Sequence, residues 1–225
     1  MSRLIAISDI HGCCNTFQQL LETINFSIED HLILCGDYID RGLHSMQTLD
    51  LILGYIDKGY AITCLRGNHE VMFLDAYNDS TLVPRFLNAG GNYTLTSFGV
   101  DKISDIPKVY IDFIQGLKSY HIEGDFLFVH AGLNFELENP LDDEEAMFWT
   151  RGMVVNPKQV DFKTIVYGHT PVVLSDIEDM IAQRSVTYMV DIDNGCVFEK
   201  DGMNCLLAYF PLENNFVVQK NIDYL

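Results

Sequence analysis

Short apolar runs recur along the chain, and their length predicts buried strands. Most are bounded by Gly, Asn, Asp or Ser, which favour turns. Two segments have the residues that favour hairpin turns, Asp193-Asn194-Gly195 and Asp201-Gly202. The expected strands cover residues 4–7, 31–35, 60–65, 120–122, 126–130, 164–168, 187–192, 196–199, 205–211 and 215–220.

Helical spacing separates the early strands. Phe17, Leu20, Leu21 and Ile24 fall on one face of a helix, and Gly59 ends a second helix. The expected helices cover residues 16–24, 45–58 and 107–117, with a mixed, helical pattern over 71–99. The chain therefore alternates strand and helix up to about Leu74 and is rich in strands after residue 120. This pattern predicts an α/β protein.

Length and charge narrow the classes of function. The chain has 225 residues, which suits one domain, and no linker or repeat divides it, so we expect a single catalytic domain over residues 1–225. The formal net charge of −18 disfavours a general binder of nucleic acid or anionic membranes, because both ligands require a basic surface. A phosphorylated substrate stays compatible, since bound cations and a few arginines can reverse the local field.

The N-terminal segment and the cysteines indicate a cytoplasmic protein. Met1-Ser2-Arg3-Leu4 leads directly into a short apolar run, without the longer apolar region of a secretory signal. The sequence has no apolar stretch of the length that crosses a membrane. The six cysteines are scattered, and Cys35 and Cys64 lie inside predicted strands. We expect buried, reduced thiols.

Polar side chains follow five of the predicted strands, where each strand ends. Because open α/β folds place their sites at the carboxyl ends of parallel strands, we expect these side chains to meet. The residues are Asp9 and His11, then Asp37, Asp40 and Arg41, then Arg66, Asn68 and His69, then His130, and finally His169.

Taken singly, most of these residues have an ordinary structural interpretation as turn acids, caps or strand-end histidines. The segment from Gly36 to Gly42 is stronger, because a simple turn has no need of Arg41 between two acids. Together the segments supply oxygen and nitrogen donors without cysteine, which suits Mn²⁺, Fe or Zn²⁺. Two such ions about 3.5–4 Å apart can share a carboxylate and generate a hydroxide for in-line attack.

Other polar residues lack this context. His31, His44 and His121 do not follow a predicted strand in this way, and we interpret them as surface or structural histidines. The acidic run from Asp142 to Glu145 is typical of a solvated helix start.

The order of the motifs resembles the phosphoprotein phosphatase branch of the calcineurin-like metallophosphoesterases, from Ile5 to about Phe198. The motifs are Asp9-x-His11-Gly12, Gly36-Asp37-x-x-Asp40-Arg41-Gly42, Gly67-Asn68-His69-Glu70, His130-Ala131-Gly132 and Gly168-His169. Smaller similarities to bacterial and phage members are Asn88-Ala89-Gly90-Gly91, Phe148-Trp149-Thr150-Arg151 and Asp191-Ile192-Asp193-Asn194-Gly195. The resemblance implies a four-layer α/β/β/α sandwich of two mixed sheets, with a dinuclear metal site at the sheet edge.

The resemblance also implies a role for each site residue. Asp9 and His11 would bind the first metal, Asp37 would bridge both, and Asn68, His130 and His169 would hold the second. His69 would be the general acid, and Asp40 would orient it. Arg41 and Arg151 would hold the phosphate, with Arg66 in a supporting role.

The implied activity is phosphomonoester hydrolysis, foremost of phosphoserine or phosphothreonine in proteins, by a hydroxide that bridges two divalent ions. Mn²⁺ is favoured, and Fe or Zn²⁺ would also fit. Expected partners are a phosphorylated protein or a small phosphoester, but neither nucleic acid nor membrane, and the sequence leaves the oligomeric state open.

Alternatives remain at this point. Bis(5'-nucleosyl)-tetraphosphatases share nearly all of these motifs, and a broad-specificity phosphatase is a further possibility. In the symmetrically cleaving bacterial hydrolases the last histidine is usually followed by Trp, whereas here Thr170-Pro171 follows His169 and favours the protein phosphatases. A binding protein without catalysis is disfavoured, because it would not need the His69–Asp40 pair.

Overall fold

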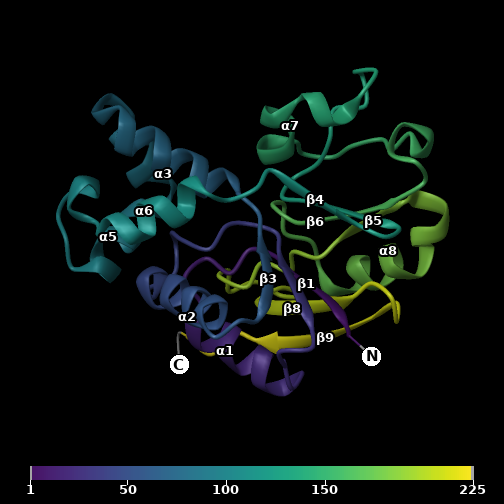
Figure 1. The fold of residues 1–225 in the computed structure, drawn as a ribbon, viewed down its shortest axis with the longest axis horizontal. Coiled ribbons are helices and arrows are strands. Elements are labelled where there is room, and N and C mark those ends of the chain that lie inside the picture. The colour runs from purple at the N-terminus through teal and green to yellow at the C-terminus, as the bar shows by residue number, and fades with distance from the viewer. Residues whose placement is uncertain (1, 224–225) are drawn as a thin grey trace.

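The structure is a computed structural model that describes residues 2–223. Two β-sheets pack against each other, and helices cover their outer faces (Figure 1). Both sheets mix parallel and antiparallel strands. The predicted four-layer α/β/β/α sandwich is confirmed.

The first sheet has the strand order β3-β2-β1-β8-β9. β1, β2 and β3 are parallel, whereas β8 and β9 add to the edge of β1 as an antiparallel pair. The chain thus returns from its C-terminal part to complete the sheet that its N-terminal part begins. The strands are β1 (Leu4–Ile7), β2 (His31–Leu34), β3 (Ala61–Cys64), β8 (Cys205–Phe210) and β9 (Asn215–Lys220).

The second sheet has the order β4-β5-β6-β7. β5, β6 and β7 are parallel, and β4 forms an antiparallel hairpin with β5. The strands are β4 (Tyr120–Glu123), β5 (Phe126–Val129), β6 (Thr164–Tyr167) and β7 (Met189–Asp191).

The helices lie mainly between the early strands and in the long excursion between β3 and β4. In Figure 1, α3, α5 and α6 gather on one side of the molecule, and α7 lies on the other side, beyond β4. The helices are α1 (Cys14–Thr23), α2 (Ser45–Asp57), α3 (Asn68–Asn78), α4 (Val83–Phe86), α5 (Asn92–Phe98), α6 (Lys108–Gln115), α7 (Glu144–Trp149) and α8 (Leu174–Thr187). Short helical turns cover Ser80–Leu82, Leu87–Gly91, Ile103–Asp105, Pro140–Asp142 and Pro157–Val160.

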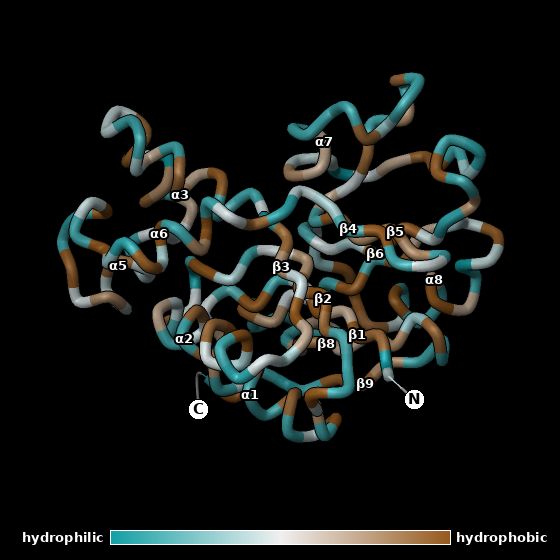
Figure 2. The backbone as a smooth tube through the Cα atoms, viewed as in Figure 1, coloured by the Kyte–Doolittle hydropathy of each residue, from teal (hydrophilic) through white to brown (hydrophobic). Residues whose placement is uncertain are grey.

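The alternation of side chains along each strand divides the core into layers. Ile5 and Ile7 of β1 face the helices, where they join Phe17 of α1. Leu4 and Ala6 face the second sheet instead. A third cluster covers the far side of the second sheet, where Met147 and Phe148 of α7 pack on β5 and β6. In Figure 2 the interior strands β2 and β5 are brown, and the outer loops are largely teal.

Most predicted elements are confirmed, and the differences lie between residues 174 and 199. Residues 196–199 form a turn and an irregular segment rather than a strand. Residues 174–187 form helix α8, which the sequence pattern does not predict because Ile177 and Ile181 are its only buried residues. The predicted strand over 187–192 is therefore reduced to β7 (Met189–Asp191). The acidic run does start a helix: Asp143 accepts a hydrogen bond from the Ala146 amide at the start of α7.

Within residues 2–223, no helix combines the length and the apolar character that crossing a lipid bilayer requires.

Candidate active site

The predicted site residues follow the carboxyl ends of five parallel strands in the two sheets. Asp9 and His11 follow β1, Asp37 follows β2, and Asn68 and His69 begin α3 after β3. His130 follows β5 and His169 follows β6. All of these side chains are buried. The sandwich therefore brings residues from across the chain to one edge.

The loops that carry these side chains have an unusual backbone. Non-glycine residues rarely adopt positive φ angles, which cost roughly 1–3 kcal/mol each and cluster at functional sites. Six of the predicted site residues do so: Asp9, His11, Asp37, Asp40, Arg41 and His169.

Asp37 lies at the centre of the cluster. Its Oδ2 is 3.5 Å from His11 Nε2 and 3.6 Å from His130 Nε2. Asp9 Oδ1 lies 4.0 Å from His11 Nε2. Asp37 thus takes part in two groups of potential ligand atoms, one with His11 and His69 and one with His130 and His169.

The second group is the more compact. Asn68 Oδ1 is 3.0 Å from His130 Nε2 and 2.9 Å from His169 Nδ1. The two histidine nitrogens lie 3.2 Å apart. The other ring nitrogen of His130 is 2.9 Å from the Cys35 carbonyl oxygen, and that of His11 is held in the same way by Ile39. A backbone carbonyl on one nitrogen leaves the other free to bind a metal, as is usual for histidine ligands.

The donor atoms fit divalent cations. Among residues 2–223, Asp9 Oδ1 is one of the buried polar atoms that lack a hydrogen-bond partner. Buried polar groups of this kind are rare in proteins unless an ion or another ligand satisfies them. The set of carboxylate, amide and imidazole donors suits Mn²⁺, Fe or Zn²⁺.

The electrostatics point the same way. Burial lowers the pKa of His11 well below its usual value, and the nearby Arg41 adds to this effect. Burial and the neighbouring His130 lower the pKa of His169 to about 3. Both imidazoles are therefore neutral, which is the form that binds metals. Burial raises the pKa of Asp37, and a cation beside this carboxyl would favour its charged form.

His69 and Asp40 form a pair beside the cluster. His69 Nδ1 lies 2.7 Å from Asp40 Oδ2, and Thr94 donates a 2.6 Å hydrogen bond to the other carboxylate oxygen. His69 Nε2 lies 4.0 Å from Asp37 Oδ2, so this nitrogen is on the side of the cluster. Burial lowers the pKa of His69, but Asp37 and Asp40 more than offset this effect, and the net shift is upward.

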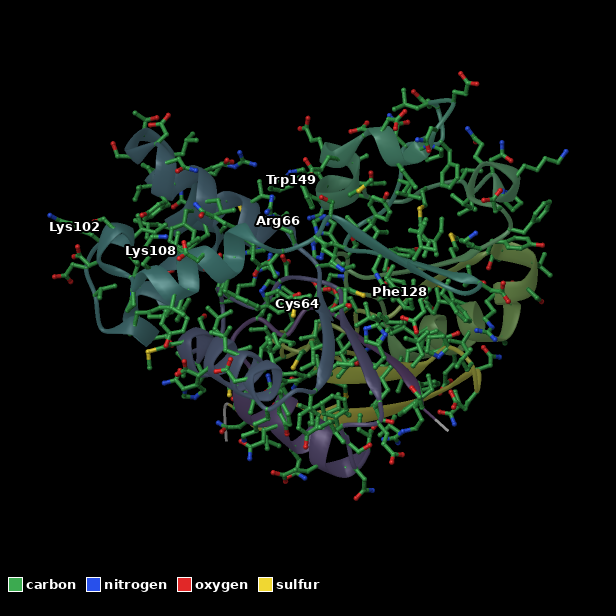
Figure 3. All side chains as sticks on the ribbon, viewed as in Figure 1. Cys64, Arg66, Lys102, Lys108, Phe128 and Trp149 are labelled. Atoms are coloured by element: carbon green, nitrogen blue, oxygen red, sulfur yellow. The ribbon has the colours of Figure 1, made fainter. Side chains whose placement is uncertain are left out.

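The three predicted arginines differ in position. Arg41 reaches the cluster, with Nη1 2.7 Å from His11 Nε2, and its guanidinium lies over the Phe198 ring. Arg151 is exposed and donates to Thr170 Oγ1 at 3.3 Å, one residue beyond His169. Arg66 instead donates to the carbonyls of Gln115 and Leu117 (Figure 3 labels it just beyond the end of β3). The described contacts of Arg66 therefore tie it to the end of α6 and to the residues that follow it.

The sequence did not identify several residues that hold the cluster in place. The buried Glu70 carboxylate accepts hydrogen bonds from the amides of Asp37, Tyr38 and Gly67. It thereby fixes the loop after β2 against the start of α3. Its position in the Gly67-Asn68-His69-Glu70 segment was the available signal.

Two further acids, Asp191 and Asp193, lie near Asp9. Asp191 and Asp193 are buried, and burial raises the pKa of both, with Asp9 as an additional cause. Asp193 accepts a hydrogen bond from the Gly195 amide, and Asp191 accepts one from the Asp193 amide. They shape the loop that follows β7.

The family model of calcineurin-like phosphoesterases matches residues 2–212. The chain belongs to this family. Among relatives of this calcineurin-like phosphoesterase, an asymmetrical bis(5'-nucleosyl)-tetraphosphatase of Oceanobacillus iheyensis is 24% identical, over 94% of this chain and 89% of the relative. A symmetrical bis(5'-nucleosyl)-tetraphosphatase of Dechloromonas aromatica is 32% identical over 57% of this chain, which spans 43% of that relative.

Solved structures agree on the fold of this calcineurin-like phosphoesterase. A putative diadenosine tetraphosphatase superposes with a TM-score of 0.65 at 19% identity, over 96% of this chain and 92% of that one. A protein serine/threonine phosphatase from Saccharomyces cerevisiae superposes with a TM-score of 0.66 at 13% identity, over 97% of this chain and 79% of that one. At these identities the likeness shows the fold alone.

Proposed function

We propose that this calcineurin-like phosphoesterase hydrolyses phosphoesters with two divalent metal ions, and that its substrate is a dinucleoside polyphosphate. The observation that carries the metal-dependent reaction is the position of Asp37, which belongs to both groups of ligand atoms at the sheet edge. The relatives that match nearly the whole chain are named as asymmetrical bis(5'-nucleosyl)-tetraphosphatases, which supports the substrate class.

In this proposal Asp9 and His11 would hold one ion, Asn68, His130 and His169 would hold the other, and Asp37 would contribute to both. When bound, the two ions supply positive charge for the phosphoryl group and lower the pKa of an attacking water. The combination of carboxylate and amide oxygens with imidazole nitrogens suits Mn²⁺, Fe or Zn²⁺, and we use Mn²⁺ as the ion for the tests below.

The chain's own residues do the rest. Arg41 at the cluster and Arg151 at its exposed side bind phosphoryl oxygens, since a guanidinium matches their geometry with two parallel donors. His69 protonates the oxygen of the leaving group, and the carboxylates of Asp37 and Asp40 raise the pKa of its ring, which favours the protonated form. Asp40 holds the ring so that Nε2 faces the reacting atoms.

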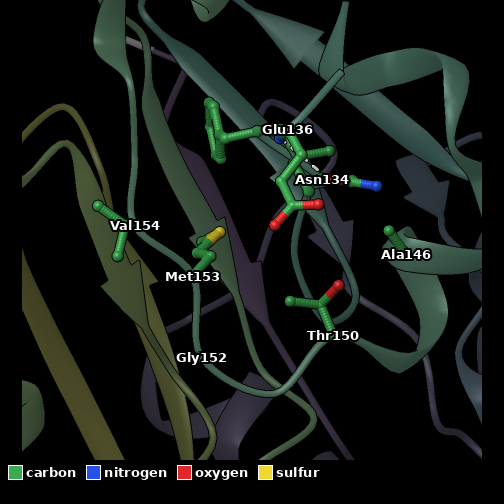
Figure 4. A pocket seen from close by; sticks show the side chains of 9 residues that line it. Asn134, Glu136, Ala146, Thr150, Gly152, Met153 and Val154 are labelled. Atoms are coloured by element: carbon green, nitrogen blue, oxygen red, sulfur yellow. Dashed lines mark hydrogen bonds between the residues drawn. The ribbon is translucent and has the colours of Figure 1, made fainter.

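A cavity beside Arg151 offers room for a large leaving group. It has a volume of ≈ 490 Å³, and its walls include Thr150 and Gly152, which flank Arg151 (Figure 4). Phe135 and Met153 supply apolar surface, and Asn134 and Glu136 supply polar groups at the opposite wall. A pocket of this size and mixture suits a small organic group such as a nucleoside. A phosphate held by Arg151 would place the attached nucleoside here.

Phosphoprotein is the second candidate substrate. The specific observation in its favour is Thr170-Pro171 directly after His169, which resembles the protein phosphatases. Thr170 also contacts Arg151, so this difference lies at the presumed phosphate position.

One comparison tests the proposal. The Mn²⁺-loaded chain is given diadenosine tetraphosphate, a phosphoserine peptide and free nucleotides side by side, and the products are separated by chromatography. We expect the highest kcat/KM for the dinucleotide, with AMP and ATP as products. Preference for the phosphopeptide would select the second candidate. A lack of turnover on every phosphoester, with Asp37→Asn as the inactive control, would overturn the proposed activity.

A further inference from the structure

His31 and His121, which the sequence does not place in the active site, meet at the opposite end of the sandwich from that site. His31 is the first residue of β2, whereas Asp37 follows the other end of that strand. The four residues of β2 alone span roughly 10 Å of extended chain. His121 and Glu123 of β4 belong to the second sheet. The cluster formed by His31, His121 and Glu123 thus joins the two sheets.

The three side chains converge on one point. Glu123 Oε2 lies 2.6 Å from His31 Nδ1 and 3.1 Å from His121 Nε2. The two imidazole rings are in contact, with centroids 5.6 Å apart at an angle of 74°. All three ligand atoms lie within 4.8 Å of one another. This group shares no residue with the cluster around Asp37.

The three polar side chains lie at the margin of an apolar layer between the two sheets. Side chains alternate along β2, so His31 faces the same way as Ile33, which packs between the sheets. His121 and Glu123 pair with Phe128 and Phe126 of β5, two further residues of that apolar layer. The inner faces of packed sheets are normally apolar. A polar group at this margin departs from the pattern of the core, as functional sites do.

Neighbouring side chains already orient the two rings. His31 Nε2 lies 3.0 Å from Thr63 Oγ1 on the adjacent strand, so its proton can sit there and leave the Nδ1 lone pair facing Glu123. The His121 ring stacks on Phe128 at 6.3 Å and 26°. A hydrogen-bonded second nitrogen and a fixed ring plane are the features that orient histidine ligands in metal sites.

We propose that His31, His121 and Glu123 form a metal site that binds Zn²⁺ and ties the two sheets together. Two imidazoles and one carboxylate are a common ligand set for Zn²⁺, and water completes the fourth position. Bonds of about 2.0–2.1 Å in a tetrahedron place ligand atoms about 3.3 Å apart. The 3.1 Å contact already matches this spacing, and the 2.6 Å contact needs to open by less than one ångström. The side chains are partly exposed, so the ion can reach them from solvent.

The test counts metal by difference, so it does not depend on how many ions the predicted active site holds. The full-length chain and its His121→Gln variant are equilibrated with buffered Zn²⁺, and bound zinc is measured by mass spectrometry. We expect the variant to hold one ion fewer per chain than the unmodified protein. His44→Gln is the matched control, because His44 is half-buried and lies outside the cluster. It should retain the full zinc content.

Two further readouts separate coordination from a simple structural role. Thr63→Val removes the hydroxyl next to His31 without removing a ligand, and we expect about 10–100-fold weaker binding at this site alone. With Co²⁺ in place of Zn²⁺, the unmodified chain should show an additional visible tetrahedral absorption band, seen as the difference from His121→Gln and from Glu123→Gln. Equal zinc content in the unmodified chain, in His121→Gln and in Glu123→Gln would overturn the proposal. The three residues would then be a hydrogen-bonded pair of histidines on a carboxylate.

Discussion

His69 Nδ1 lies 2.7 Å from Asp40 Oδ2, and both side chains are almost completely buried. Thr94 holds the second oxygen of the same carboxylate, so the ring of His69 has a fixed orientation. The ring nitrogen opposite the hydrogen bond, Nε2, lies on the side of Asp37. This relationship sets both the direction and the acidity of the proton that we assign to the leaving group.

Replacement of Asp40 by Asn should shift the pH dependence of the reaction. Burial lowers the pKa of His69, and the negative charges of Asp37 and Asp40 raise it above its usual value. Loss of one charge lowers that pKa, so His69 loses its proton at a lower pH. We expect the alkaline limb of the kcat/KM profile to move to lower pH, and kcat to fall for substrates with alkoxide leaving groups.

The leaving group provides the control for this prediction. p-Nitrophenolate needs little protonation, so hydrolysis of p-nitrophenyl phosphate should fall much less than that of an alkyl phosphate, where a general acid typically contributes ~10²–10⁴-fold. Asp57→Asn, at an exposed position of α2, should leave both profiles unchanged. An unshifted alkaline limb in Asp40→Asn would remove His69 from the role of acid.

Replacement of Gly168 by Ala should weaken metal binding, because the added methyl group would displace Asp9. A Cβ added there would overlap with Ser8 Oγ and Asp9 Oδ2, so Asp9 would have to move. We expect Gly168→Ala to weaken binding of the first metal and to lower activity at least ten-fold at limiting Mn²⁺. Isothermal titration with Mn²⁺ measures the change.

Gly54 supplies the matched substitution. It lies inside α2 with no atom within 4 Å of an added Cβ. Ala at this position should leave metal binding intact and raise stability by up to about 1 kcal/mol, because Ala favours the helix. If Gly168→Ala bound Mn²⁺ as tightly as Gly54→Ala, Asp9 would not be a ligand in the way that we propose.

The cavity beside Arg151 should select large substrates. Val154 is 90% exposed at its rim, so a bulkier side chain there is tolerated by the fold and fills the cavity. We expect Val154→Trp to raise KM for diadenosine tetraphosphate several-fold and to leave p-nitrophenyl phosphate unaffected. Steady-state kinetics on both substrates provide the measurement.

Val186→Trp is the control. Val186 is also exposed, but it lies on α8 and is not among the residues that line the cavity. An equal change of KM in both variants would exclude the cavity as a substrate site.

The ion pair between Arg3 and Asp30 should make stability depend on pH in acid. Arg3 donates hydrogen bonds to both oxygens of the buried Asp30, and its guanidinium lowers the pKa of that carboxyl from 3.8 to about 2. Because the folded-state pKa is depressed, the stabilisation is complete above pH 3.8 and is lost as the pH falls toward 2.

Urea unfolding of the metal-free chain at a series of pH values tests this dependence. We expect Arg3→Met to lower the free energy of unfolding by on the order of 1–2 kcal/mol at neutral pH, a value reduced for the partial exposure of Arg3. The difference from the unmodified chain should shrink below about pH 4. Lys108→Met, which breaks the exposed pair with Asp112, should cost less than about 0.5 kcal/mol. A difference for Arg3→Met that stays constant into acid would contradict the assignment.

The sequence predicts which side chains meet at the sheet edge because each of their segments follows a strand. Apolar runs mark where β1, β2, β3, β5 and β6 end, and parallel pairing brings those ends to one edge. Helix α8 was missed because Ile177 and Ile181 give it a narrow apolar face, and Val186 and Thr187 at its end favour a strand. Its position depends on packing between the sheets rather than on local preference.

The contact among His31, His121 and Glu123 could not be predicted from the sequence for a related reason. His31 and His121 lie in different sheets, and no local pattern relates their strands. The contact forms only when the two sheets pack with a particular offset, which depends on the fit of side chains such as Ile33 and Phe128. Glu70 is an intermediate case: its segment was recognised, but its three backbone partners became apparent from the folded loops.

A titration of the metal-free protein with Mn²⁺, in which activity on diadenosine tetraphosphate and bound metal are measured together, tests the central claim most directly. If Asp37 joins two ions at the sheet edge, activity should be absent without metal, rise with added Mn²⁺, and level off as the active site reaches two ions per chain. In Asp37→Asn both the stoichiometry and the activity should fall. Full turnover in a rigorously metal-free sample would contradict the account.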